Sequence, residues 1–372
     1  MKFIVSSGVL LKKLQLIGGV VSSNTVLPIL EDFLFEVEGG QLTAHATDLE
    51  TSMSATVEVD GTGSCRIAVP ARLMLDFLKA LPEQPITLKV NTDNYSVEIT
   101  SERGKYRLAG ENGEDFPRIP TAEEARELKM ASSVLANAIN KTLFAVSTDD
   151  MRPAMMGVNM ELGGEGTTFV ATDAHRLVRY RRQDIKSPKA ASLIVPRKAL
   201  QLLAHALPSE ETQVRLSYNN SNAFFAFDQV RLICRLIDAR YPDYNAVIPT
   251  ENPNQLTVSS ADLLQSLRRL IILSSKSSYQ TTFQLSGSSL QITARDIDFS
   301  NEGSETLSCR YSGEPMEISF NGKFLTEILT ALNEDEVVMR MSTPSRACVI
   351  TPAQQKDYED LLMLVMPIMI GS

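Results

Sequence analysis

The residue types that most often carry chemistry are sparse in this chain. His45, His175 and His205 do not stand at a metal-ligand spacing from one another or from a cysteine, so we expect no zinc or iron site. Asp173 and His175 could form an acid–base pair, and a hydrolase built on them would lose its turnover when His175 is changed to alanine. Asp48, however, takes the equivalent place in an earlier copy of the same pattern, without a histidine two residues later. We therefore expect Asp173 to be a turn residue and the protein not to be an enzyme.

Cysteine and glycine patterns exclude several other classes of chemistry. Neither Gly-x-x-x-x-Gly-Lys-Ser/Thr nor Gly-x-Gly-x-x-Gly occurs, so we expect neither a bound nucleotide nor another cofactor. No run of eighteen apolar residues occurs, and the first residues lack a long apolar core and a cleavage site. We therefore expect a cytoplasmic protein without a membrane segment. The cysteines lie far apart without a Cys-x-x-Cys pair, which is typical of buried thiols in a reducing compartment. They are Cys65, Cys234, Cys309 and Cys348.

The chain repeats one pattern three times. Each copy has a serine pair before an amphipathic helix, an alternating strand that ends in a polar turn, and a second helix. The serine pairs are at 6–7, 132–133 and 259–260, the strands at 41–48, 168–173 and 290–296, and the second helices at 69–82, 195–208 and 320–333.

A repeat of about 120 residues is long enough to be a domain in its own right. The fold class we predict is α+β, with three repeated domains that each pack two helices on antiparallel sheet. Polar linkers around 123–124 and 252–254 place the domains at residues 1–122, 128–250 and 254–372.

Charge is distributed unevenly between the predicted helices and the remaining chain. The net charge of −9, from 45 acidic and 36 basic residues, argues against nucleic acid unless the basic residues are segregated. The six helices hold ten of the basic residues but only three acidic ones, Asp76, Asp262 and Glu327. We predict DNA contacts at Lys12, Arg72, Lys79, Arg197, Lys198, Arg268, Arg269 and Lys323; Lys13 and Lys141 complete the ten.

Such a basic helical lining, with an acidic sheet exterior, would attract phosphates without reading bases. The alternative is that exposed helix faces simply favour lysine and arginine.

Several landmarks together resemble the bacterial DNA sliding clamps, the beta subunits of DNA polymerase III. They are the segments 27–30, 47–50, 172–177, 194–198, 241–244 and 365–367, and the resemblance runs in order from Met1 to about Ile368. It implies a head-to-tail homodimer that forms a ring around duplex DNA, with the helices inside. It also implies that a clamp loader opens the ring and that replicative and repair polymerases dock on it. A scaffold that never encloses DNA is the competing interpretation.

The resemblance also assigns roles to individual residues. It places the dimer interface at Tyr106 and Leu108 on one side and Ile272 and Leu273 on the other. Ile272 falls opposite the apolar stripe of its own helix, so a partner would bury it. A pocket for short motifs of glutamine followed by leucines and an aromatic residue maps onto Met155, Thr172, His175, Arg176, Leu177, Pro242, Val247, Leu364, Val365, Met366, Pro367 and Ile368.

The sequence departs from the family pattern at several of these surfaces. Pro153 and Ala154 replace a pair of aromatic residues, and Asn245 and Ala246 stand where basic residues are frequent. Asn24 takes the place of a common arginine, and the tail continues to Ser372.

Overall fold

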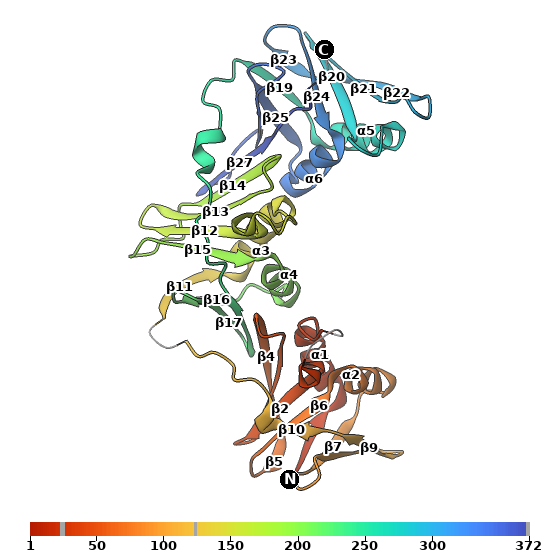
Figure 1. Cartoon of the computed structure of the whole chain (residues 1–372), viewed down its shortest axis with the longest axis vertical. Helices are drawn as coiled ribbons and strands as arrows, with labels where there is room; N and C mark the ends of the chain where they lie inside the picture. Colours follow the sequence, from red (N-terminus) through yellow and green to blue (C-terminus); the bar gives the residue numbers. More distant parts are fainter. Residues whose placement is uncertain (23–26, 123–124, 370–372) are drawn as a thin grey trace. The chain divides into compact units, whose positions relative to one another are not determined.

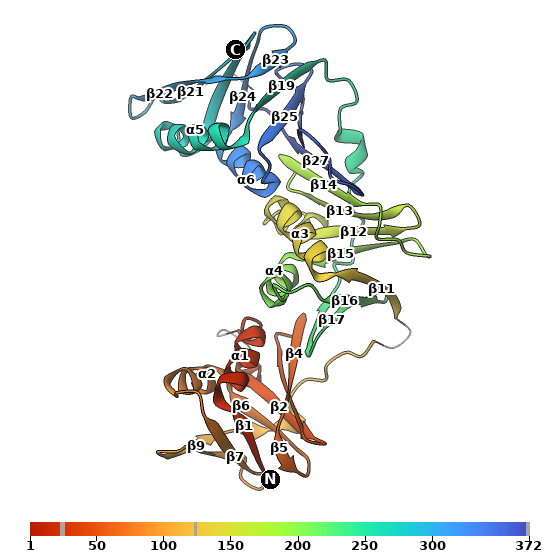
Figure 2. The ribbon, with the colours of Figure 1, turned by 180° about the vertical axis from the view of Figure 1, so that it is seen from behind.

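The computed structural model describes residues 1–22, 27–122 and 125–369 (Figures 1 and 2). The chain forms two compact units. The first unit comprises Met1–Ala136 and Lys198–Leu236, and the second comprises Asn137–Arg197 and Ile237–Ser372. Asn24, the linker pair at 123–124 and the tail after Met369 lie outside the described residues.

Two antiparallel sheets build the first unit. The smaller has the order β5 (Asp60–Thr62), β1 (Lys2–Ser6), β7 (Pro85–Asn91), β8 (Ser96–Thr100), β9 (Lys105–Ala109). The larger has the order β10 (Glu111–Asn112), β6 (Cys65–Pro70), β2 (Asp32–Glu38), β3 (Gln41–Thr47), β4 (Thr51–Glu58), β18 (Val230–Arg235), β17 (Asn222–Phe227), β16 (Gln213–Tyr218), β11 (Arg126–Ala131). The β4–β18 pair joins the first repeat to the second, in a register from Ala55 opposite Val230 to Thr51 opposite Cys234.

The second unit repeats this plan with one long and one short sheet. The long sheet has the order β15 (Ala191–Pro196), β12 (Gly157–Gly163), β13 (Gly166–Thr172), β14 (Arg176–Arg182), β27 (Glu359–Val365), β26 (Cys348–Pro352), β25 (Glu336–Met341), β19 (Asn254–Ser259), β23 (Arg310–Ser312). The short sheet has the order β22 (Asn301–Ser308), β21 (Ser289–Asp296), β20 (Gln280–Ser286), β24 (Met316–Asn321). Here β14 pairs with β27, from Arg176 opposite Val365 to Arg182 opposite Glu359, and so joins the second repeat to the third.

The predicted helices are all present, two in each repeat. They are α1 (Ser7–Gly18), α2 (Ala71–Ala80), α3 (Ser132–Thr142), α4 (Arg197–Ala206), α5 (Ser260–Leu273) and α6 (Gly322–Leu332). Short 3-10 turns lie at η1 (Pro28–Glu31), η2 (Gly113–Asp115), η3 (Leu143–Ala145), η4 (Pro153–Met156) and η5 (Tyr244–Val247). The α1–α2 and α5–α6 pairs each pack side by side (Figure 1).

Local chemistry explains where these helices begin and which face they bury. The hydroxyls of Ser6 and Ser259 accept hydrogen bonds from free amides in the first turns of α1 and α5, as the serine pairs predict. Leu10 and Leu14 of α1 are fully buried, and so are the matching leucines of α5. The apolar stripes therefore form the cores, and the charged positions between them stay at the surface.

The same carboxylate turn precedes β4 and β14. Asp48 Oδ1 accepts hydrogen bonds from the amides of Glu50 and Thr51, at 3.0 and 2.6 Å. Asp173 Oδ1 accepts from His175 and Arg176 in the same way, both at 2.9 Å. The residue after each aspartate has a positive φ, 77° at Leu49 and 75° at Ala174. Asp173 is therefore a turn residue of the fold, as we expected from the repeat.

Candidate nucleic-acid and peptide interfaces

The predicted DNA-binding lysines and arginines on the helices of the first unit differ in whether a carboxylate already pairs with them. Lys12 and Arg72 are exposed and have no ion-pair partner among the described residues. Lys79 is exposed, with its Nζ 3.6 Å from Asp76 Oδ1. The Lys198 ammonium is ion-paired with the carboxylate of Asp48. Lys198 must therefore leave the Asp48 carboxylate before it can contact a DNA phosphate. The spacing of charges along the sequence did not reveal this ion pair.

The helical cations of the second unit show the same division. Arg268 and Lys323 are exposed, and the Lys323 Nζ lies 5.3 Å from the ring centroid of Tyr279. Arg197 is half-buried. Arg269 is held by Glu305, with 2.6 Å between Nη2 and Oε2, and this contact lowers the pKa of the Glu305 carboxyl. Arg269 is thus already neutralised within its own repeat.

Lys141 corrects the charge pattern that we inferred from the helices. The sequence places it among the ten helical cations, but its side chain is only 4% exposed. Its Nζ lies 3.5 Å from the carbonyl of Leu332 in α6 and 5.9 Å from the ring centroid of Tyr180 in β14, so neighbouring elements cover it.

The β14–β27 joint brings several of the predicted pocket residues together. Leu177 lies opposite Leu364, and the amide of Met366 donates a hydrogen bond to the carbonyl of His175 at 2.8 Å. Both leucines are buried in one cluster with three residues that sequence reasoning did not assign to the pocket. These are Val170, Tyr244 and Ala347. Tyr244 lies in the segment 241–244, one of those on which the family resemblance rests, so the sequence did point to this residue.

The remaining pocket residues divide into an exposed and a covered set. Val247 is 55% exposed and Met366 is 39% exposed, so these two offer apolar surface to a ligand. Thr172 is buried, and its hydroxyl donates to the carbonyl of Arg176 at 2.7 Å. The amide of Ile368 donates to the carbonyl of Ser319 at 2.8 Å, which binds this end of the chain to β24. Half-buried positions are Met155, Pro242, Pro367 and Ile368, and Val365 is buried.

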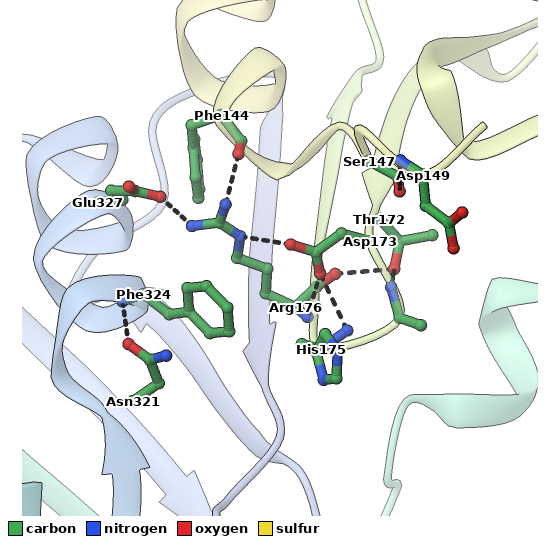
Figure 3. Close-up of polar contacts among 11 residues, drawn as sticks. Phe144, Ser147, Asp149, Thr172, Asp173, His175, Arg176, Asn321, Phe324 and Glu327 are labelled. Carbon is green, nitrogen blue, oxygen red and sulfur yellow. Dashed lines mark hydrogen bonds and ion pairs between the residues drawn. The ribbon is translucent and has the colours of Figure 1, made fainter. Parts of the chain in front are cut away.

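Arg176, one of the predicted pocket residues, is held by several contacts within the chain (Figure 3). Its Nε donates to Asp173 Oδ2 at 2.9 Å, its Nη2 donates to the carbonyl of Phe144 at 2.8 Å, and its Nη1 is ion-paired with Glu327. The guanidinium carbon also lies 4.4 Å from the ring centroid of Phe324. Because Phe324 and Glu327 belong to α6, Arg176 fastens β14 to a helix of the third repeat.

The predicted dimer residues lie beside two open sheet edges, β9 and β22, which pair with no second strand on their outer sides among the described residues. Tyr106 in β9 is exposed, with its ring 4.7 Å from that of Phe77. Ile272 is 67% exposed and Leu273 is half-buried. Leu108 is only 7% exposed, so it has little surface left for a partner to cover.

The turn before β22 adds apolar surface that sequence reasoning missed. Ile297 and Phe299 are among the most exposed large apolar side chains of the described residues. Their spacing within a polar turn gives no periodic signal, because exposure there depends on the tertiary fold.

The cysteine thiols are not activated as nucleophiles. Burial raises the pKa of all four cysteine thiols, so the nucleophilic thiolate is disfavoured at each. Within residues 1–22, 27–122 and 125–369, no group of three or more His, Cys, Asp or Glu side chains could hold a metal ion. No helix in that part of the chain is long and apolar enough to cross a membrane.

Three two-helix repeats joined by shared sheets define the DNA-clamp class of fold. Models of the N-terminal, central and C-terminal domains of the DNA polymerase III beta subunit match residues 1–120, 129–243 and 245–367. The chain belongs to the DNA polymerase III beta subunit family.

Named relatives and solved structures match along the whole chain. The beta sliding clamp of Vibrio cholerae is 30% identical over 371 residues, covering 99% of this chain and all of that protein. The clamp of Escherichia coli K12 is 30% identical over 365 residues, with 98% and 99% covered. The Pseudomonas aeruginosa DnaN clamp bound to griselimycin has a TM-score of 0.94 at 29% identity, with both chains fully covered. These proteins are named as clamps and not for a reaction, in keeping with a protein that is not an enzyme.

We expect Arg176→Lys to loosen α6 from β14. Lysine keeps the charge but cannot serve Asp173, Phe144 and Glu327 together, so the variant should lose about 1–3 kcal/mol of stability. Hydrogen exchange of the first turns of α6, measured by mass spectrometry, should become faster. Arg152→Lys, which alters an exposed pair with Asp149, is the matched control and should cost less than about 1 kcal/mol. Unchanged exchange in α6 would contradict the fastening role.

Proposed function

We propose that two copies of this chain close head to tail into a ring around duplex DNA, and that the ring keeps DNA polymerases on their template. Family membership supports the clamp activity, and the relatives are named for it. The single observation that carries the ring is the strand order at the joints between repeats.

Each joint uses equivalent strands from consecutive repeats. β4 and β14 are each the third strand after the first helix of their repeat, and each follows the Asp turn. β18 and β27 are the third strands after the second helix. The corresponding strands left over are β22 in the third repeat and β9 in the first. A β22–β9 joint with a second copy would repeat the pattern and cover both open edges.

Charge and exposed apolar surface support this third joint. Exposed Arg103, Lys105 and Arg107 lie in or beside β9 with one exposed carboxylate, Glu102. Exposed Asp298 and Glu302 lie in or beside β22, where Glu302 is ion-paired with Arg295. Opposite charges on the two edges favour pairing of β9 with β22 over pairing of either edge with itself. Burial of Tyr106, Ile272, Ile297 and Phe299 would supply the hydrophobic part of the contact.

We assign sequence-independent phosphate contacts to the helical cations. Lys12, Arg72, Arg268 and Lys323 are the exposed ones without a carboxylate partner among the described residues. Lys79, Arg197, Lys198 and Arg269 remain candidates for contacts made after a change of partner. Phosphate contacts of this kind hold a protein near DNA and let it slide.

We also propose that the Leu177–Leu364 region receives the linear motifs of partner proteins. The buried leucines form a firm floor, while Val247 and Met366 give adaptable apolar surface. The partner proteins would be replicative and repair polymerases and the clamp loader that opens the ring. Their binding would take place in the bacterial cytoplasm.

We expect the loaded protein to remain on a nicked circular plasmid and to be lost when the plasmid is cut to a linear form. A ring held by topology can leave only over a free end. The measurement is gel filtration of labelled protein after loading, with and without the restriction enzyme. A scaffold bound to the DNA surface would stay with both forms, and that result would contradict the ring.

Loss of the exposed apolar side chains should weaken motif binding. We expect Val247→Ser and Met366→Ser each to lower the affinity for a fluorescent peptide of glutamine, leucines and phenylalanine by about five- to thirtyfold, which corresponds to about 1–2 kcal/mol of apolar burial. Fluorescence anisotropy gives the dissociation constant. Val9→Ser changes an exposed valine of α1 and should leave the affinity unchanged. Equal affinity in all four proteins would exclude this surface as the docking site.

A further inference from the structure

Three methionines are exposed among the described residues, and one of them belongs to the proposed docking surface, the Leu177–Leu364 region with Val247 and Met366. Met366 is 39% exposed, whereas Met151 is 87% exposed and Met369 is 69% exposed. Seven other methionines are at most 3% exposed: Met53, Met74, Met130, Met160, Met339, Met341 and Met363. A thioether that meets solvent can be oxidised to a polar sulfoxide. Met366 therefore combines an oxidisable sulfur with a place in an apolar contact.

The folded chain, and not a frayed end, keeps Met366 at the surface. Its amide donates to the carbonyl of His175 at 2.8 Å, and the amide of Ile368 donates to the carbonyl of Ser319, also at 2.8 Å. The preceding residue, Val365, lies opposite Arg176 in the β14–β27 joint. Because the backbone is bonded on both sides of Met366, the partial exposure of its side chain is a property of the fold.

The cysteines compete poorly for an oxidant. Cys234 and Cys348 are buried, and Cys65 and Cys309 are half-buried. Burial raises the pKa of each thiol, so the thiolate, which is the form that peroxide attacks, is scarce. The exposed thioethers are therefore the sulfur groups most open to an oxidant in solution.

We propose that Met366 is an oxidation site at which hydrogen peroxide converts the thioether to a sulfoxide and thereby switches partner docking off. A lone pair of Sδ attacks one peroxide oxygen, so that an S–O bond forms while the O–O bond breaks. The hydroxide that leaves takes the proton of the transferred oxygen and becomes water. Sulfur is oxidised and peroxide is reduced. The proposal rests on the proposed function, because it concerns the surface that receives the linear motifs.

The new oxygen weakens docking because an apolar motif would strip it of water beside the buried leucines. A polar group that is buried without a hydrogen bond destabilises the contact. The adjacent backbone cannot satisfy it, since the amide of Met366 is bonded to His175 and Pro367 has no amide hydrogen. Methionine sulfoxide reductases restore the thioether, one enzyme for each sulfoxide epimer, so the switch is reversible.

The first test compares the affinity of the full-length protein for the fluorescent glutamine–leucine–phenylalanine peptide before and after treatment with hydrogen peroxide. The peptide contains no sulfur, so only the protein is oxidised, and peptide mapping by mass spectrometry locates the added oxygen. We expect the wild type to lose at least about fivefold in affinity when Met366 carries the oxygen. Both sulfoxide reductases together should restore it.

The controls use the ratio of the dissociation constants after and before peroxide in each protein, so that a variant's starting affinity does not matter. In Met366→Leu this ratio should stay near one, because leucine cannot be oxidised. Met151→Leu and Met369→Leu keep Met366 and should show the wild-type ratio. Unchanged affinity of a wild type oxidised at Met366, or an equal loss in Met366→Leu, would overturn the proposal.

The second test reverses the roles of ligand and oxidant. A bound motif covers Met366, so saturating peptide should slow the addition of oxygen at Met366 at least about fivefold and leave the rate at Met151 unchanged. Equal rates at Met366 with and without peptide would contradict the proposal. Untreated protein without affinity for the peptide would overturn the docking surface itself, whereas affinity that peroxide does not change overturns the oxidation site alone.

Discussion

The sharing of one sheet between consecutive repeats is the interaction on which the rest of the structure depends. A repeat by itself would expose a strand edge with unpaired amides and carbonyls, and such edges attract other chains. The β4–β18 and β14–β27 pairs satisfy two of these edges inside the chain. They also fix the register of both long sheets, and hence the positions of the turns, the leucine cluster and the helices packed over them.

The two joints use the same turn but recruit different cations. Asp48 and Asp173 each order the loop before the joint with one carboxylate oxygen, and the other oxygen takes a basic partner. In the first repeat that partner is Lys198, a helical cation; in the second it is Arg176, which goes on to α6. At the first joint, the turn therefore neutralises Lys198, one of the predicted DNA contacts. At the second joint, the turn contributes to the Arg176 contacts that hold β14 to α6 beneath the predicted docking surface.

Much of this architecture could be predicted from short-range patterns in the sequence. The three repeats, the six helices, the serine caps of α1 and α5 and the turn role of Asp173 all follow from spacing over a few residues. Spacing could not show that Lys141 and Leu108 are buried, because a neighbouring element covers each of them. Likewise, the engagement of Lys198 and Arg269 depends on carboxylates far away in the chain. Charge counting along helices therefore overstated the free cationic surface.

The open edges β9 and β22 make the closed two-chain ring the central claim, and solution mass tests it most directly. Light scattering across a dilution series should give a concentration-stable species of twice the 41.0 kDa chain mass. Ile272→Asp, which puts a charge into the proposed joint, should shift the protein toward the single-chain mass. A wild-type protein of single-chain mass throughout the micromolar range would contradict a ring that closes by itself.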